Sequence, residues 1–299
     1  MKRGRSRALL AAGENGGVSN THRSDSGEHP SSVGASTRRR LYKLRASSSG
    51  KRSVLAGWLT AATLLTVFWQ LVHILYPGQV PGVLGTLAFL AQEGALTIAE
   101  NTVLTLARTA AGFLIGATTA LALGLLYTLG PLAKETVRAL NTVLQSVSVL
   151  VWSLVLVMLF GVLSPIPPVL VAALVALPIM LSALLSGLES ANPRLIELAI
   201  LLGADRKKLY KDFLLPSLLP ALAGAGRAAL GAALRISVVA EAFGSSGGIG
   251  YMIATYYSLA EPRGVFAWGL VLVTLMIVLD KLVLEHLEER IRRWAALPR

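Results

Sequence analysis

The stretch from Ala139 to Leu188 contains no charged residue, and this run constrains the fold more than any other feature of the chain. A transmembrane helix needs about 20 mostly apolar residues, so the run is too long for a single span. Its middle, at 161–168, reads GVLSPIPP, and three prolines with a glycine cannot continue a helix without losing hydrogen bonds. The run therefore predicts two membrane-spanning helices, at about 139–160 and 166–188.

The rest of the sequence is apolar enough to supply further spans. The chain is 54% hydrophobic and 15% charged, whereas about one-quarter of the residues of soluble domains are charged. The same length criterion of about 20 apolar residues adds four candidate spans, at 54–76, 108–129, 216–240 and 264–284. We therefore expect an all-α membrane protein with six transmembrane helices, in a domain covering residues 54–290.

Small residues recur at every fourth position of the predicted span 108–129, namely at Gly112, Gly116, Ala120 and Gly124. This spacing places them on one stripe of the helix, and small side chains let two helices approach closely in lipid. We expect another helix to pack against that stripe.

The distribution of Lys and Arg predicts the orientation, because cytoplasmic loops carry an excess of these residues. With the amino terminus inside, the inner connectors and tails hold 24 Lys and Arg residues, and the outer connectors hold only Arg263. We therefore expect a multi-pass protein of the inner or plasma membrane with both termini in the cytoplasm.

The first 53 residues hold twelve of the 28 Lys and Arg residues and are rich in Ser and Gly. This composition predicts a disordered, basic, cytosolic tail. Nucleic-acid binding is not expected, because no aromatic residue except Tyr42 interleaves the arginines. We expect residues 291–299 to form a second, short cytosolic tail.

Several kinds of chemistry are excluded by residues that the sequence lacks. There is no cysteine, which excludes disulfides and thiolate sites. No G-x-x-x-x-G-K-[ST] motif occurs, so the chain cannot hold ATP phosphates in the Walker manner. The histidines are scattered without the spacing of a metal site: they are His22, His29, His73 and His286. We expect no catalytic residue, no metal and no cofactor in this chain, which is not an enzyme.

The segment 192–216 is a charged stretch between two apolar segments, and it carries the start and stop signals of two short helices. Asn192 is a good N-cap with Pro193 behind it. Gly203 can take the left-handed conformation that ends a helix, and Asp205 can cap a second helix. Pro216 then starts the fifth span. These signals predict a compact cytosolic protrusion. An alternative is that two basic helices simply lie on the anionic membrane surface. This would explain the lysines and arginines of the segment, but not the combination of Glu197, Ala199, Gly203, Leu215 and Pro216.

The other residues of this segment follow a known spacing. It reads E-x-A, three residues, G, nine residues, an apolar residue, x and L-P, and is met by Glu197, Ala199, Gly203, Phe213, Leu215 and Pro216. The pattern resembles the signature of the permease subunits of binding-protein-dependent ABC importers. One position departs from it, because Leu198 stands where those permeases usually have Ala.

Further motifs extend the resemblance over about residues 95–290. TLARTAAGFLIG at 105–116 is similar to the second span in the nitrate, sulfonate and taurine branch of these permeases. The sequence LPSLLPALAGAGRAALGAAL at 215–234 looks like the fifth span of that branch, and VVAE at 238–241 with GIGYMI at 248–253 looks like the outer loop that follows. The 1–53 tail has no counterpart in these motifs.

The resemblance implies a type I ABC importer permease fold and a homodimer around a central path. It also implies two ATP-binding partner subunits, which bind ATP and Mg, and an extracytoplasmic solute-binding protein. The solute would be small, such as a sulfonate, taurine or nitrate, with bicarbonate and vitamin precursors also known for this branch.

The resemblance further assigns segment 192–216 to ATPase coupling. A protrusion that fits a groove on the ATPase can turn its closure into a rocking of the fourth and fifth spans. Gly203 would allow the close turn, Leu202 and Leu209 would fill the groove, and Glu197 and Asp205 would hold the protrusion's own hydrogen bonds. Ala199, Phe213, Leu215 and Pro216 complete the signature.

Charges within the predicted spans need an explanation, because a charged side chain in the bilayer costs at least about 2.5 kcal/mol. Arg235 is either a handle for an anionic solute in the translocation path, together with Glu241, or a buried partner for a carboxylate or carbonyl. We expect Arg227 to snorkel or pair, and Arg108 to tie its helix to a neighbour. The motif GSSGGIGYMI at 244–253 is expected to be a flexible outer turn before a short helix.

The competing class is a non-transporting membrane scaffold or sensor, for which the basic tail is the main argument. A channel or an ion-coupled carrier would need acids inside the membrane, and the spans offer only residues near the rim such as Asp280.

Overall fold

The computed structural model describes residues 56–190 and 215–284. The two predicted tails and nearly all of the predicted coupling segment therefore lie outside the described residues. The chain divides into two compact units, Met1–Thr63 and Leu64–Arg299. The described part of the first unit, 56–63, is helical and exposed. Within the described ranges every regular element is a helix, which confirms the all-α prediction.

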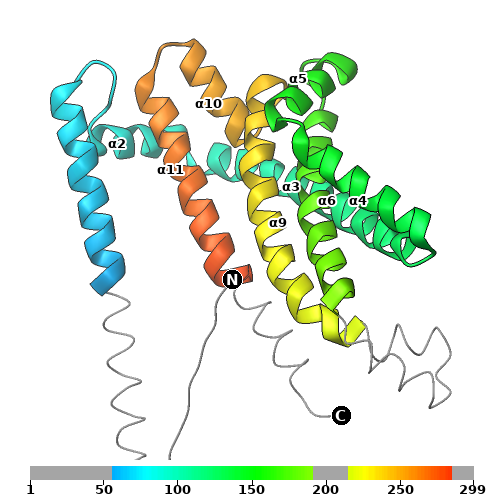
Figure 1. Ribbon diagram of the computed structural model, residues 1–299. Coiled ribbons are helices and arrows are strands. Elements are labelled where there is room, and N and C mark those ends of the chain that lie inside the picture. Colours follow the sequence, from blue (N-terminus) through cyan, green and yellow to red (C-terminus); the bar gives the residue numbers. More distant parts are fainter. Residues whose placement is uncertain (1–55, 191–214, 285–299) are drawn as a thin grey trace, which may run out of the picture. The chain divides into compact units, whose positions relative to one another are not determined.

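The second unit, from Leu64 onward, contains nearly all the described helices (Figure 1). A helix at Ala56–Leu75 ends in this unit. The others are α2 (Val83–Glu93), α3 (Ala95–Tyr127), α4 (Pro131–Ser146), α5 (Val149–Phe160), α6 (Ile166–Ser190), α9 (Leu215–Phe243), α10 (Ile249–Ser258), α11 (Pro262–Val278) and a π-helix at Leu279–Leu284.

Five helices of the described residues are long and apolar enough to cross a membrane, and a sixth is reached if α4 and α5 form one bent span. The five are Ala56–Leu75, α3, α6, α9 and α11. This agrees with the expected multi-pass membrane protein.

The stripe of small residues on α3 is packed against α6, as its spacing predicts. A Cβ atom on Gly112 would lie 2.4 Å from the carbonyl oxygen of Val169, and one on Gly116 would lie 2.6 Å from that of Ala173. At Gly124 it would meet Leu184 at 2.0 Å. At Gly112 and Gly116 the two backbones therefore lie too close for any larger side chain, whereas at Gly124 the space is filled by a leucine side chain.

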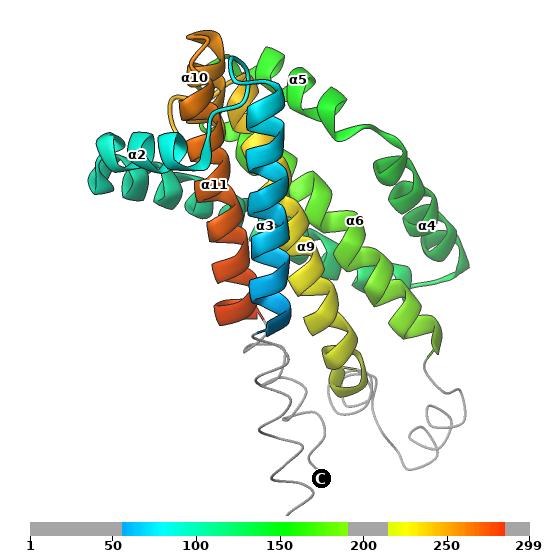
Figure 2. The same cartoon turned by 90° about the vertical axis from the view of Figure 1, so that its left-hand side faces the viewer.

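Helices α6 and α9 lie side by side in both views (Figure 1, Figure 2) and share a buried apolar core with α3. The core includes Ala120, Ala176, Leu181, Ala229 and Ala233. The predicted break in the charge-free run is confirmed, since α5 ends at Phe160 and α6 begins at Ile166.

Two differences from the predicted spans have local causes. The stretch predicted as one span at 139–160 is divided between α4 and α5, which meet at an angle of 88°. Val147 and Ser148 have extended backbone at this bend, with no proline or glycine to mark it. The span predicted to begin at Arg108 belongs to a helix that begins at Ala95 and is about 50 Å long at 1.5 Å per residue. Asn101 and Thr105, two polar residues near the start of this helix, form hydrogen bonds with the backbone at 248–249.

The turn between Leu75 and α2 is held by side chains of the preceding helix. The indole Nε1 of Trp69 donates to the carbonyl oxygen of Pro81 at 3.0 Å. Nδ1 of His73 lies 2.6 Å from the carbonyl oxygen of Val80, which requires the proton on that nitrogen. Trp69 also stacks near Phe266 of α11, with 5.7 Å between the ring centroids. These contacts give His73 a structural role.

Candidate functional site

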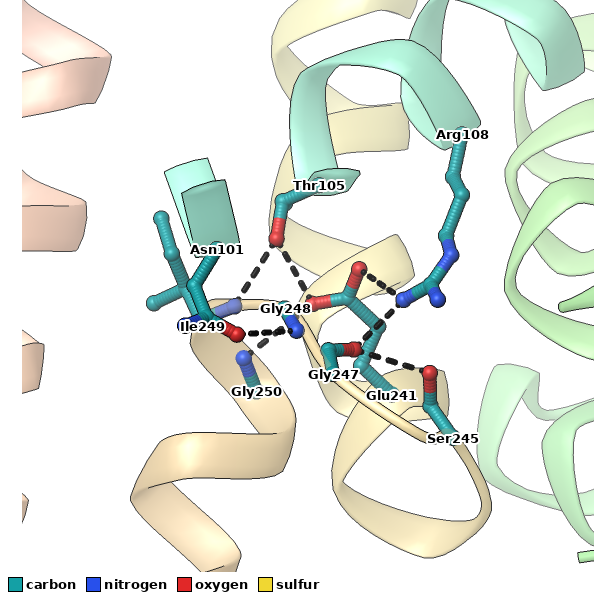
Figure 3. Close-up of polar contacts among 9 residues, drawn as sticks. All are labelled: Asn101, Thr105, Arg108, Glu241, Ser245, Gly247, Gly248, Ile249 and Gly250. Carbon is teal, nitrogen blue, oxygen red and sulfur yellow. Dashed lines mark hydrogen bonds and ion pairs between the residues drawn. The ribbon is translucent and has the colours of Figure 1, made fainter. Parts of the chain in front are cut away.

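A buried carboxylate in the last turn of α9 is the centre of the most extensive polar site among the described residues (Figure 3). Glu241 is 1% exposed. Its Oε2 accepts hydrogen bonds from the hydroxyl of Thr105 at 2.8 Å and from the backbone N–H of Gly250 at 3.1 Å. Its Oε1 accepts one from Nη1 of Arg108 at 3.0 Å. Three donors from two other elements therefore satisfy this charge.

The same α3 side chains also bind the backbone of the loop between α9 and α10. Nη1 of Arg108 donates to the carbonyl oxygen of Gly247 at 2.5 Å. Oδ1 of Asn101 accepts from the N–H of Gly248 at 2.7 Å, and Oγ1 of Thr105 accepts from the N–H of Ile249 at 2.9 Å. Each of these residues lies one turn from the next on α3. We call Asn101, Thr105, Arg108, Glu241 and the loop 247–250 the Glu241 clamp.

Two glycines of the clamp cannot be replaced without strain. Gly248 has φ +108°, a conformation that residues with a Cβ rarely adopt. A Cβ on Gly250 would lie 1.9 Å from the carbonyl oxygen of Val238. The sequence predicted a flexible outer turn here, and that prediction is wrong, because backbone and side-chain hydrogen bonds fix the loop. The short helix predicted to follow it is confirmed as α10.

The opposite side of α10 is fastened to α2. The hydroxyl of Tyr256 donates to the carboxylate of Glu93, and its ring meets Phe89 edge-on with 5.2 Å between the centroids. Burial, followed by the hydrogen bond to Glu93, raises the pKa of Tyr256 to about 12. The phenol therefore keeps its proton, and its role as a donor, throughout the physiological range.

A second polar cluster joins the ends of α3 and α6 to the middle of α4. Oε1 of Glu189 accepts from the hydroxyl of Tyr127 at 2.6 Å and from Nη2 and Nε of Arg138 at 2.6 and 3.2 Å. We call these three residues the Glu189 junction. Arg138 also reaches the exposed Glu135 at 2.7 Å.

The structure gives each intramembrane charge a position. Arg108 ties α3 to α9 and to the loop after it, as expected, although it lies well inside the helix. Arg227 pairs with Asp280 through two hydrogen bonds of 2.9 Å, which confirms the expected pairing. Arg235 and Glu241, proposed together for the translocation path, lie on different faces of α9, because Glu241 is enclosed in the clamp while Arg235 is exposed.

The predicted coupling residues from Glu197 to Phe213 lie outside the described residues, and Leu215 and Pro216 begin α9. Sequence reasoning missed the roles of Asn101, Thr105, Tyr127 and Glu189. Thr105 and Arg108 stand together in the TLAR motif, and Glu189 is the first charge after the long apolar run, so both signals were present in the sequence. Among the described residues, no group of three or more His, Asp or Glu could hold a metal ion.

A bundle of long apolar helices with buried charges bound internally is typical of a polytopic membrane protein. The chain belongs to the family of binding-protein-dependent transport system inner membrane components, which it matches over residues 112–293. The chain is therefore an ABC transporter permease, a subunit of an importer.

Relatives agree with this family. A Methanocaldococcus jannaschii protein named as an ABC transporter permease is 26% identical over 79% of this chain and 91% of its own length. The glycine betaine/proline betaine permease ProW of Escherichia coli is 27% identical, with 71% of this chain and 60% of ProW covered. The aliphatic sulfonates permease SsuC of Bacillus subtilis is 30% identical, with 62% and 67% covered.

A solved structure shares the fold. An inward-facing conformation of the MetNI methionine ABC transporter superimposes with a TM-score of 0.58 and 21% sequence identity, covering 68% of this chain and 97% of the other. At this identity the similarity shows the fold alone, which is that of a type I ABC importer permease.

Proposed function

We propose that two copies of this chain form the translocation path for a small anion, such as a sulfonate, taurine or nitrate, driven by ATP-binding partner subunits on the cytoplasmic side. ATP and Mg are held by those partners, and a solute-binding protein delivers the solute on the other side. Both termini of this chain lie in the cytoplasm. The observation that carries the proposal is the family match at 112–293, which includes the complete spacing from Glu197 to Pro216.

We assign ATPase coupling to segment 192–216. The segment leaves α6 after Ser190 and returns at Leu215, the start of α9. These two helices are packed tightly where they flank it, because Gly187 leaves room only for the side chain of Leu218. A force applied to the segment would therefore act on α6 and α9 together.

Gly203→Asp tests this assignment, because a charged side chain at the tight turn would prevent the protrusion from entering the ATPase groove. We expect ATP-dependent uptake to be abolished in reconstituted vesicles while membrane insertion is unchanged. Gly130→Asp is the matched control. It adds the same charge before α4, where a Cβ meets nothing within 4 Å. Wild-type uptake by Gly203→Asp would refute the coupling assignment.

The choice of an anion rests on the sulfonate permease among the relatives and on Arg235. Arg235 is exposed on a membrane-spanning helix, and a cation facing hydrocarbon would cost at least about 2.5 kcal/mol. A water-filled path gives it a favourable position. Glu241 already has three donors, so we propose that Arg235 meets the solute and that Glu241 supports the outer end of α9.

The role of Arg235 is tested by exchanging its charge. Loss of one hydrogen bond to a charged group costs about 1.5–3 kcal/mol, so Arg235→Gln should slow uptake of taurine or an alkanesulfonate by roughly tenfold or more. Arg235→Lys, which keeps the charge, should retain most of the uptake. Thermal-shift screening of the partner binding protein first selects the solute. Equal uptake by Gln and wild type would assign Arg235 to a subunit contact instead.

A further inference from the structure

The Glu189 junction occupies the place where the predicted coupling segment leaves the helical bundle. Glu189 is in the last turn of α6, next to the final helical residue Ser190. Its single oxygen Oε1 accepts all three hydrogen bonds of the junction, from Tyr127 at the end of α3 and Arg138 in α4. One carboxylate therefore joins three helix segments at the base of the segment 191–214.

Tyr127 anchors the junction to the core. Its ring is only 6% exposed and belongs to the same apolar cluster as Val137, Leu181 and Leu185. On its other side, Nζ of Lys134 and Cζ of Arg138 lie 5.3 and 5.7 Å from the ring centroid. Such cation–π contacts hold the cations of α4 against α3. Glu189 is therefore bonded directly to an aromatic side chain that is held in the core.

Helix α4 is attached to α6 by polar contacts as well as by the buried side chain of Val137. Nδ2 of Asn141 donates to the hydroxyl of Ser182 at 2.9 Å, and Nε2 of Gln145 donates to the same oxygen at 3.3 Å. The apolar side chains of Leu140 and Val143 are exposed. In lipid there is little hydrophobic drive between helices, so close packing and hydrogen bonds together hold them in contact. The junction and Ser182 thus provide two successive attachments of α4 to α6.

Helices α4 and α5 together form an arm, and its far end reaches the C-terminal end of α9. Helix α4 continues into α5 through the 88° bend. On α5, Val157 packs so closely against α9 that a Cβ on Gly244 would lie 2.7 Å from it. Gly244 follows Glu241 by less than one turn. The α4–α5 arm therefore extends from the Glu189 junction to the vicinity of the Glu241 clamp.

We propose that the Glu189 junction makes α3 and α4 follow the movement of segment 191–214, and that Glu189 is a positioning residue for ATP-driven transport. This inference rests on the proposed function of that segment. When an ATPase displaces the segment, α6 and α9 move with it, since they hold its two ends. The three hydrogen bonds of Glu189 then carry α3 and α4 along, and the arm moves α5 against α9. Without them, α6 can move while α4 stays behind.

The absence of cysteine from the chain permits a direct measurement of this movement. Cysteines replace two exposed valines, Val143 of α4 and Val273 of α11, and carry spin labels. The complex with its ATPase subunits is reconstituted in lipid, and the distance between labels is compared without nucleotide and after trapping with ATP and vanadate. The wild-type junction should give a distance change. Glu189→Gln should remove most of it, because the neutral amide weakens both bonds to Arg138.

The second readout is the uptake of solute per ATP hydrolysed. We expect Glu189→Gln to lower this ratio by roughly fivefold or more, the lower end of typical coupling free energies, while ATP hydrolysis continues. Glu135→Gln is the control, since it removes the same charge one turn away and touches only the exposed side of Arg138. It should keep both the distance change and the ratio.

Two further variants protect the test against a folding defect. Tyr127→Phe removes one hydrogen bond and keeps the ring, and it should also lower the uptake of solute per ATP hydrolysed. Arg138→Glu combined with Glu189→Arg restores an ion pair with the charges exchanged, and it should recover part of the lost uptake per ATP.

The outcomes separate the two proposals. If Glu189→Gln and Tyr127→Phe keep the wild-type distance change and ratio, or lose uptake and hydrolysis in proportion, the junction has no transmitting role. If the wild-type complex shows neither ATP-dependent uptake nor a distance change, the proposed function fails, and the junction proposal with it.

Discussion

The Glu241 clamp and the Glu189 junction both fasten helices through a carboxylate and an arginine, yet they differ in exposure. The side chains of Arg108 and Glu241 are 8% and 0% exposed, whereas those of Arg138 and Glu189 are 40% and 43% exposed. In the clamp the carboxylate also fixes a glycine loop, and in the junction it faces solvent beside a segment proposed to move. The same pair of residue types can therefore serve rigidity in one place and movement in the other.

The physical reason is the penalty for separating the charges. Breaking a buried pair leaves an uncompensated charge in a medium of low dielectric constant, whereas an exposed pair exchanges its partner for water. We therefore expect the clamp to stay closed throughout a transport cycle. The junction can adjust its geometry at little expense while its three hydrogen bonds hold, which suits a part that must follow an external force.

Glu241→Ala should have the largest effect on stability. It leaves Arg108 buried and unpaired and removes the acceptor of Thr105 and Gly250, so we expect a loss of about 3–5 kcal/mol. Thermal unfolding in detergent micelles measures this loss. Arg108→Ala combined with Glu241→Ala should be less destabilising than the sum of the two. Additive losses would show that the pair does not act as a unit.

Gly250→Ala should follow in size, because its Cβ would lie 1.9 Å from the carbonyl oxygen of Val238. Overpacking of this kind costs about 1–3 kcal/mol. Gly85→Ala in α2 is the control, since its Cβ meets nothing within 4 Å and alanine is favoured in a helix by up to about 1 kcal/mol. The two substitutions should therefore shift the melting temperature in opposite directions. A rise for both would mean that the loop can relax.

Much of the bundle could be predicted from the sequence because lipid imposes simple requirements. The charge-free run, its proline break and the stripe at Gly112, Gly116 and Gly124 each predicted what the structure shows. The bend at Val147 and Ser148 could not be predicted, since neither residue breaks a helix by itself. The start of α3 was placed too late, because Glu93 and Glu100 suggested a polar connector and the partners of Asn101 and Thr105 lie in a distant loop.

For the polar sites too, features with a local sequence signal could be predicted, and features that depend on distant partners could not. Local signals placed Arg108 and Arg227 in structural roles, and the structure gives both a carboxylate partner. Glu241 was proposed for the path because its charge is visible in the sequence, whereas the three donors around it are not. Thr105 and Arg108 lie more than 100 positions away, and the third donor is the backbone N–H of Gly250 in the following helix. Long-range partners of this kind leave no periodic pattern.

Thr105→Val should have a moderate effect and sharpens the account of the clamp. The substitution keeps the shape of the side chain but removes a donor to Glu241 and an acceptor for the N–H of Ile249. Leaving buried polar groups unsatisfied costs about 1–3 kcal/mol. Thr105→Ser retains the hydroxyl and should recover most of that loss. Equal melting temperatures for Val and Ser would show that the hydroxyl is not required.

Glu189→Gln should have the smallest effect on stability, although it is expected to uncouple transport. Exposed ion pairs contribute little to folding, so the melting temperature should match that of the wild type. Salt provides an independent check, because it screens exposed charges and acts much less on buried ones. Raising the ionic strength should therefore lower the wild-type coupling ratio toward that of Glu189→Gln while leaving the melting temperature, which the clamp helps to set, unchanged. A melting temperature that falls as far for Glu189→Gln as for Glu241→Ala would remove the distinction between the two sites.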